Sequence, residues 1–193
     1  MAATGVRIAF AGALMAAVLA LAGCGGTTQH LAVSHRHTPD AEARIVVLPA
    51  GIPAALALPP DTGRTVARLY ATELLRSYEV LDYDRLFANL QTRKVTLQQL
   101  VTGQAPEIAE ELGVDGVLES EIYRWEPGTP GFWFLAKEGQ VGFHAHLVDV
   151  RTGSVIWSVN RVRPTRPNDT LAVGLGPVFE DLASEMPSQL TPY

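Results

Sequence analysis

Residues 146–158, "HLVDVRTGSVIWS", predict two strands joined by a tight turn. The residues on either side of "DVRTGS" (149–154) are apolar and rich in β-branched types, which is typical of strands. Gly153 takes a positive φ without steric cost, so we place the chain reversal at Thr152 and Gly153. The pattern predicts a hairpin of two long strands within residues 139–163.

The segments before this hairpin predict a strand, a helix and a second strand. "RIVVLP" (44–49) is a continuous apolar run ended by a proline, which is typical of a strand buried on both faces. A helix should begin at Asp61 or Thr62, because apolar residues then recur at three- and four-residue spacing. "YEVLDY" (78–83) predicts the next strand, and the connection is long enough for a right-handed parallel crossover.

Two short helices should follow, one opening with the capping-box residues Thr96 and Gln99 and one opening at Pro106. "DGVLESEIYRWE" (115–126) then alternates as a strand does. Residues 171–190 have helical spacing, but glycines and prolines interrupt them, so we expect a broken helix. The order of elements predicts an α/β protein with a mixed sheet of about five strands and helices packed on its faces.

Three of these segments carry a resemblance to a known group of proteins. "RIVVLP", "IAEELGVDGVLESEI" (108–122) and residues 146–158 resemble the core segments of bacterial envelope lipoproteins whose domain is similar to the N-terminal domain of the periplasmic protein TolB. The group includes uncharacterised lipoproteins, the curli-secretion lipoprotein CsgG and lipoprotein activators of penicillin-binding proteins. The resemblance covers residues 44–163 and implies a TolB-like fold, although Ser120 stands where the family commonly has glycine.

The first 23 residues predict a signal peptide. Arg7 is followed by an apolar stretch that is too short for a membrane-spanning helix. Leu21-Ala22-Gly23-Cys24 resembles the lipobox of bacterial lipoproteins, which implies cleavage between Gly23 and Cys24 and acylation of Cys24, including palmitate. The alternative is an uncleaved signal anchor with an inert cysteine. Gly25 follows the cysteine where aspartate would mark inner-membrane retention, so the resemblance favours the outer membrane.

Residues 24–43 predict a lipidated flexible tether, and residues 44–193 a single periplasmic domain. The tether is polar and lacks helical or strand periodicity. We interpret its histidines at positions 30, 35 and 37 as solvated side chains and not as metal ligands, because a flexible segment does not preorganise a site.

Composition excludes some functions. The formal net charge is −5, and removal of residues 1–23 takes away Arg7 alone, which leaves −6. This acidic balance, without a lysine or arginine cluster, gives no support for nucleic-acid binding. The sequence has no nucleophile elbow and no phosphate-binding loop, so we expect neither an enzyme nor a cofactor.

Two pairs of polar residues offer the strongest alternative. His144 and His146 are two residues apart in a predicted strand and share a face, as do Glu119 and Glu121 in the preceding strand. The histidine pair could form half of a metal site and the two glutamates the other half, and a metal-binding enzyme is the corresponding function. The interpretation that we favour is a polar, solvated sheet face with cross-strand charge pairs.

Three aromatic residues, Phe132, Trp133 and Phe134, lie between a loop rich in glycine and proline and a lysine. Aromatic side chains of this kind contact membranes or partner proteins at interfaces. The alternative is that they begin the next strand, with Phe132 and Phe134 in the core and Trp133 outside.

These observations together predict a periplasm-facing, outer-membrane lipoprotein that acts as a non-catalytic protein-binding or assembly module of the cell envelope. Its expected partners are the membrane, through the N-terminal lipid, and envelope proteins. The sequence is also compatible with a homo-oligomer. A third possible function, besides the binding module and the metal-binding enzyme, is that of a subunit in an oligomeric outer-membrane secretion channel. The long amphipathic hairpin segments of the secretion-channel members are not found in the sequence.

Overall fold

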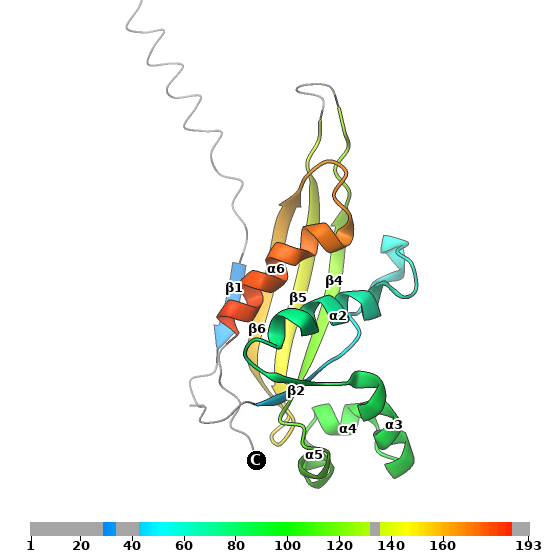
Figure 1. Ribbon diagram of the computed structural model, residues 1–193, viewed down its shortest axis with the longest axis vertical. Coiled ribbons are helices and arrows are strands. Elements are labelled where there is room, and N and C mark those ends of the chain that lie inside the picture. Colours follow the sequence, from blue (N-terminus) through cyan, green and yellow to red (C-terminus); the bar gives the residue numbers. More distant parts are fainter. Residues whose placement is uncertain (1–28, 34–42, 132–135, 187–193) are drawn as a thin grey trace, which may run out of the picture.

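The structure, a computed structural model, describes residues 29–33, 43–131 and 136–186. Its strands form one six-stranded mixed sheet in the order β1-β6-β5-β4-β2-β3 (Figure 1). The strands are Gln29–Val33 (β1), Arg44–Val47 (β2), Glu79–Leu81 (β3), Gly116–Glu126 (β4), Gly139–Asp149 (β5) and Ser154–Thr165 (β6). The helices are Ala54–Leu56 (η1), Thr62–Leu74 (α2), Tyr83–Arg93 (α3), Leu97–Val101 (α4), Pro106–Leu112 (α5) and Leu171–Glu185 (α6). The predicted α/β fold, with helices on a mixed sheet, is confirmed.

The sheet joins a parallel part to an antiparallel part. Strand β2 pairs in parallel with β3 on one side and β4 on the other, as the crossover through α2 predicted. Ile45 and Val46 are fully buried on opposite faces of β2. The β5–β6 hairpin turns at Gly153, whose φ is 67°, and whose N–H donates to the carbonyl of Asp149 over 2.8 Å. The reversal predicted at this glycine is therefore confirmed.

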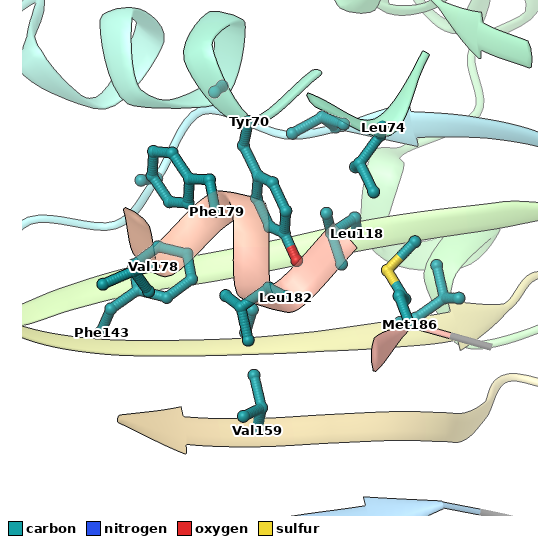
Figure 2. Packing of buried hydrophobic residues seen from close by; sticks show 14 of the residues in the cluster. Tyr70, Leu74, Leu118, Phe143, Val159, Val178, Phe179, Leu182 and Met186 are labelled. Carbon is teal, nitrogen blue, oxygen red and sulfur yellow. The ribbon is translucent and has the colours of Figure 1, made fainter. Parts of the chain in front are cut away.

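One face of the sheet is covered by α2 and α6 (Figure 1). Figure 2 shows Tyr70 reaching from α2 toward the strands beside Phe179 and Leu182 of α6. The rings of Tyr70 and Phe179 stack with their centroids 4.8 Å apart, and Phe143 of β5 meets both rings edge-on. Since each of these rings is almost fully buried, this layer supplies much of the hydrophobic stabilisation of the fold.

A buried arginine ties α6 to the sheet. The side chain of Arg161 on β6 is only 6% exposed, and its guanidinium pairs with Glu185 and, over 3.3 Å, with Asp181 of α6. Asp181 also accepts a hydrogen bond from Arg163, 3.2 Å away. Because a buried charge is costly without a partner, these carboxylates fix the position of α6 along the strand.

The second face of the sheet is covered only at one end. Helices α3, α4 and α5 lie there (Figure 1). Their buried side chains pack on the start of β4 and on β2 as a separate apolar cluster: Val46, Leu48, Leu86, Leu90, Leu100, Ala109, Val114, Val117 and Val150. The rest of this face, over β4 to β6, carries no helix in the part of the chain that is described.

Helix α3 was not predicted from the sequence. We expected Tyr83 to end a strand, but it is the first residue of α3. The carboxylate of Asp82 accepts a hydrogen bond from the N–H of Arg85 over 2.7 Å and so caps the helix. Leu86 and Leu90 then bury one face of it. The cap and this apolar stripe outweigh the β-forming residues before them.

Two further expectations were wrong. Helix α6 runs unbroken from Leu171 to Glu185 with Pro177 inside it, because its apolar side chains on both sides of the proline are held against the sheet. Residues 29–33, which we placed in the tether, form β1 and pair with β6 from Val33↔Trp157 to Gln29↔Arg161. The edge of β6 offers a row of backbone N–H and C=O groups, with which a segment can pair even when its sequence does not alternate as a strand does.

No helix in residues 29–33, 43–131 or 136–186 combines the length and the apolar character that crossing a bilayer requires.

Candidate functional site

The uncovered part of the sheet carries a connected set of polar side chains, which we call the open sheet face. Val117 points to the α3–α5 side, so residues two and four positions further along β4 point the same way. The strand register places residues of β5 and β6 directly opposite them. The members of the open sheet face are Glu119, Glu121, Tyr123, His144, His146, Ser158 and Asn160.

The histidines and glutamates meet as the sequence predicted. Glu119 lies opposite His146 and Glu121 opposite His144. Nε2 of His146 is 2.7 Å from a carboxylate oxygen of Glu119, while Nε2 of His144 is 3.3 Å from the hydroxyl of Ser158. The arrangement is a cross-strand pair of a histidine and a carboxylate beside a contact of a histidine with a hydroxyl, and both are partly solvated.

The environment of His144 favours its neutral form. Burial lowers the pKa of His144 below its usual 6.5, and the neighbouring His146 lowers it further, whereas Glu121 raises it. Burial disfavours the imidazolium because the cation loses hydration. His144 therefore offers a neutral ring nitrogen at neutral pH.

The geometry does not assemble a metal centre. The two imidazole rings are 5.4 Å apart between centroids and turn their Nε2 atoms to different partners. Within the described ranges, no group of three or more histidine, cysteine, aspartate or glutamate side chains is arranged to hold a metal ion. A protein zinc site needs at least three such ligands around one point.

One contact of the open sheet face was missed by the sequence analysis. Tyr123 lies at a β-bulge of β4, and its hydroxyl is 2.6 Å from the side-chain oxygen of Asn160 on β6, two strands away. Its ring crosses β5 over Gly142, where a Cβ atom would come within 2.6 Å of the ring. A glycine inside a strand often marks such a close approach, so Gly142 was the signal in the sequence.

The other predicted site residues lie outside the described residues: Gly23, Cys24, Phe132, Trp133 and Phe134. The chain that flanks the aromatic residues is described. Thr129 and Lys137 exchange two backbone hydrogen bonds of 2.9 and 3.0 Å, so the β4–β5 hairpin extends beyond its two strands. The membrane or partner contact of the aromatic residues stays a prediction.

The fold is shared with a solved structure. No protein-family model and no curated protein matches the sequence. The PelC dodecamer from Paraburkholderia phytofirmans has a subunit that superposes on 86% of this chain and 99% of its own, with a TM-score of 0.52 and 18% identity. This likeness shows a common fold. The expected likeness to TolB and CsgG stays a prediction.

Weaker likenesses point to similar proteins but carry no part of the argument. Lipoprotein GNA1162 from Neisseria meningitidis covers 75% of this chain and 97% of its own, at 19% identity and a TM-score of 0.47. The LpoB C-terminal domain from Salmonella enterica covers 65% and 87%, at 18% identity and a TM-score of 0.42. The similar structures thus include a bacterial lipoprotein.

Proposed function

We propose that the protein is an outer-membrane lipoprotein, anchored through an acylated Cys24, whose periplasmic domain binds other envelope proteins without catalysing a reaction. The observation that carries this proposal is the only cysteine of the chain, at the end of an apolar segment, directly before a compact α/β domain. An N-terminal lipid would hold such a domain at a membrane face without a spanning helix.

The position of β1 supports a domain held close to the bilayer. Gln29, the first residue of β1, follows Cys24 by five residues. Five residues reach at most about 18 Å when extended. The tether from lipid to sheet is therefore much shorter than the 24–43 segment alone suggested, and the partner would have to meet the domain near the membrane.

The chemistry of the described residues supports binding over catalysis. The open sheet face is the most polar cluster of the described residues. Its side chains pair with one another, such as His146 with Glu119 and Tyr123 with Asn160. Among the described side chains of this face, no serine or cysteine pairs with a histidine that a third group orients, which is the arrangement that catalysis by such a nucleophile requires.

The anchoring is tested by comparing wild-type protein with the Cys24→Ala variant in fractionated cells. We expect the wild type in the outer-membrane fraction and the variant in the inner membrane with an uncleaved signal, because lipidation and cleavage both need the cysteine. A Cys24→Ala variant that fractionates with the outer membrane as the wild type does would overturn the proposed anchor.

A second candidate function is that of a subunit in a homo-oligomeric envelope assembly. The shared fold with the subunit of the PelC dodecamer favours it. We would measure the mass of the full chain in detergent by light scattering. A ring of defined stoichiometry supports this candidate, whereas a monomer at all concentrations speaks for the binding module alone.

A further inference from the structure

The start of β1 and the β4–β5 hairpin lie at the same end of the sheet. Strand β1 is antiparallel to β6, and its first residue, Gln29, pairs with Arg161. Arg161 also pairs with Phe143 of β5, so Gln29 and Phe143 are at the same level along the strands. The N-terminal end of β1 therefore points toward the end of the sheet where β6 finishes and β4 and β5 are joined. The β5–β6 turn lies at the opposite end (Figure 1).

The β4–β5 hairpin extends well beyond Gln29 in this direction. Its described outer part, residues 128–131 and 136–138, is called the hairpin stem. Lys137 of the stem precedes Phe143, which is level with Gln29, by six residues. In a regular ladder these six residues span about 20 Å, at about 3.3 Å per residue.

The segment between Cys24 and β1 is too short to keep a bilayer away from the hairpin stem. Cys24 precedes Gln29 by five residues, which reach at most about 18 Å when they extend along the strands. A lipid on Cys24 therefore brings the bilayer surface to the level of Lys137 or below it. The connection from Gly131 to Ala136 then has to meet the lipid headgroups.

The composition of this end of the sheet suits a lipid surface. The connection is Phe-Trp-Phe-Leu in the sequence, residues 132–135, which lie outside the described residues. Such side chains favour the boundary between headgroups and acyl chains. Residues 124–138 and 163–169, which surround the hairpin stem and the end of β6, have four basic and three acidic side chains, whereas the whole chain has a net charge of −5. This end therefore lacks the excess of negative charge that anionic headgroups would repel.

We infer that the hairpin stem contacts the lipid bilayer, so that the strands stand on the membrane with the β4–β5 hairpin toward it. A bilayer is the occupant that the geometry favours, because the N-terminal end of β1 and the stem point the same way and reach similar heights. Helices α3, α4 and α5 pack at the start of β4, at the opposite end of the sheet. The inferred orientation leaves these helices away from the bilayer, where envelope proteins can reach them.

This inference deepens the proposed function, because it names what the hairpin contacts, and it rests on a lipid attachment at Cys24. The two are tested separately. The mass of the native protein shows whether cells acylate Cys24. The contact of the stem is measured with a maleimide lipid coupled to Cys24, the only cysteine of the chain, and does not depend on that result.

Amide hydrogen exchange, followed by mass spectrometry, measures the contact. The chain from Cys24 to Tyr193 contains every described strand and helix. It is coupled to vesicles of phosphatidylethanolamine and phosphatidylglycerol (about 3:1) and compared with the uncoupled chain in buffer. We expect peptides from residues 127–139 to exchange about fivefold more slowly after coupling, and peptides from the β5–β6 turn, residues 149–154, to exchange at an unchanged rate.

A pair of matched variants tests the hairpin stem directly. Thr129→Glu/Ala136→Glu adds two carboxylates to exposed positions of the stem. The anionic headgroups repel these carboxylates, so the variant should lose about half or more of the slowing. Ser154→Glu/Val155→Glu makes the same change at exposed positions beside the β5–β6 turn and should keep the slowing of the wild type. Circular dichroism and the melting temperature verify that both variants are folded.

Four results would overturn the inference. Residues 127–139 exchange equally fast with and without coupling, the two ends of the sheet are slowed equally, or the folded stem variant keeps the full slowing. The fourth concerns the other occupant. If residues 127–139 are slowed in isolated native membranes but not in the lipid vesicles, a protein covers the hairpin and the lipid contact is wrong.

Discussion

The two faces of the sheet differ in how they are completed. The face under α2 and α6 is closed by rings and aliphatic side chains that are almost fully buried, with one arginine neutralised by two carboxylates. The other face is closed only at one end, and its remaining side chains are polar, half exposed and paired across strands. The covered face contains most of the buried apolar contacts, whereas the uncovered part of the other face stays polar and solvated.

The largest expected effect comes from the covered face. Phe179→Ala removes a ring that stacks on Tyr70, and we expect it to lower the free energy of unfolding by about 3–5 kcal/mol. On the open sheet face, Tyr123→Phe loses one water-exposed hydrogen bond to Asn160. This variant should lower the free energy of unfolding by about 1 kcal/mol or less. Urea unfolding measures both losses, and equal losses would show that the two faces contribute equally to stability.

The buried arginine provides the next test. In the double variant Asp181→Asn/Glu185→Gln both partners are neutral and the charge of Arg161 stays buried. We expect this variant to lose about 2–4 kcal/mol of its free energy of unfolding. Arg161→Met removes the buried charge itself, while both carboxylates stay partly solvated, so its loss should be smaller, at about 1 kcal/mol. Urea unfolding of the two variants checks the order. A larger loss for Arg161→Met would show that the ion pair itself is strongly stabilising.

The hairpin that joins the two longest neighbouring strands depends on Gly153. In Gly153→Ala the new Cβ would lie within 2.4 Å of the Thr102 carbonyl, at a positive φ, and we expect a loss of about 1–3 kcal/mol. Gly51→Ala is the control, because its Cβ would be 3.5 Å from the nearest side-chain atom, an ordinary contact. Thermal unfolding of both variants is the measurement. Equal melting temperatures would contradict the assigned turn.

The smallest effect is a pH dependence on the open sheet face. The pKa of His144 is lowered in the folded protein, chiefly by burial, so the unfolded chain binds more protons. The stability that His144 contributes is therefore present above its unfolded pKa of about 6.5 and is lost as the pH falls below that value. Melting temperatures between pH 7.5 and 5.5 should fall more for the wild type than for His144→Gln. The same slope for both proteins would show that His144 does not titrate as described.

Local patterns were sufficient where a single residue determines the geometry. Gly153 located the hairpin, and the alternation in 115–126 placed Glu119 and Glu121 opposite the two histidines. Both predictions depend on residues that are close in sequence or in a regular ladder. The period of two along a strand then fixes the face of every side chain.

Contacts between segments that are distant in the sequence could not be predicted from local patterns. Helix α3 depends on the cap by Asp82 and on burial of Leu86 against other helices. Strand β1 forms by pairing with the edge of β6, and no pattern in residues 29–33 predicts this pairing. The contact of Tyr123 with Asn160 needs a bulge, whose place along a strand the alternation does not reveal.

Acylation of Cys24 is the modification that would hold this domain at a membrane, and the mass of the mature N-terminal peptide shows whether it occurs. Protein purified from membranes should begin at Cys24 and carry acyl chains on it, with residues 1–23 absent. A chain that begins before Cys24, or that begins at Cys24 with an unmodified thiol and amine, would contradict the anchor and leave the domain without a membrane attachment.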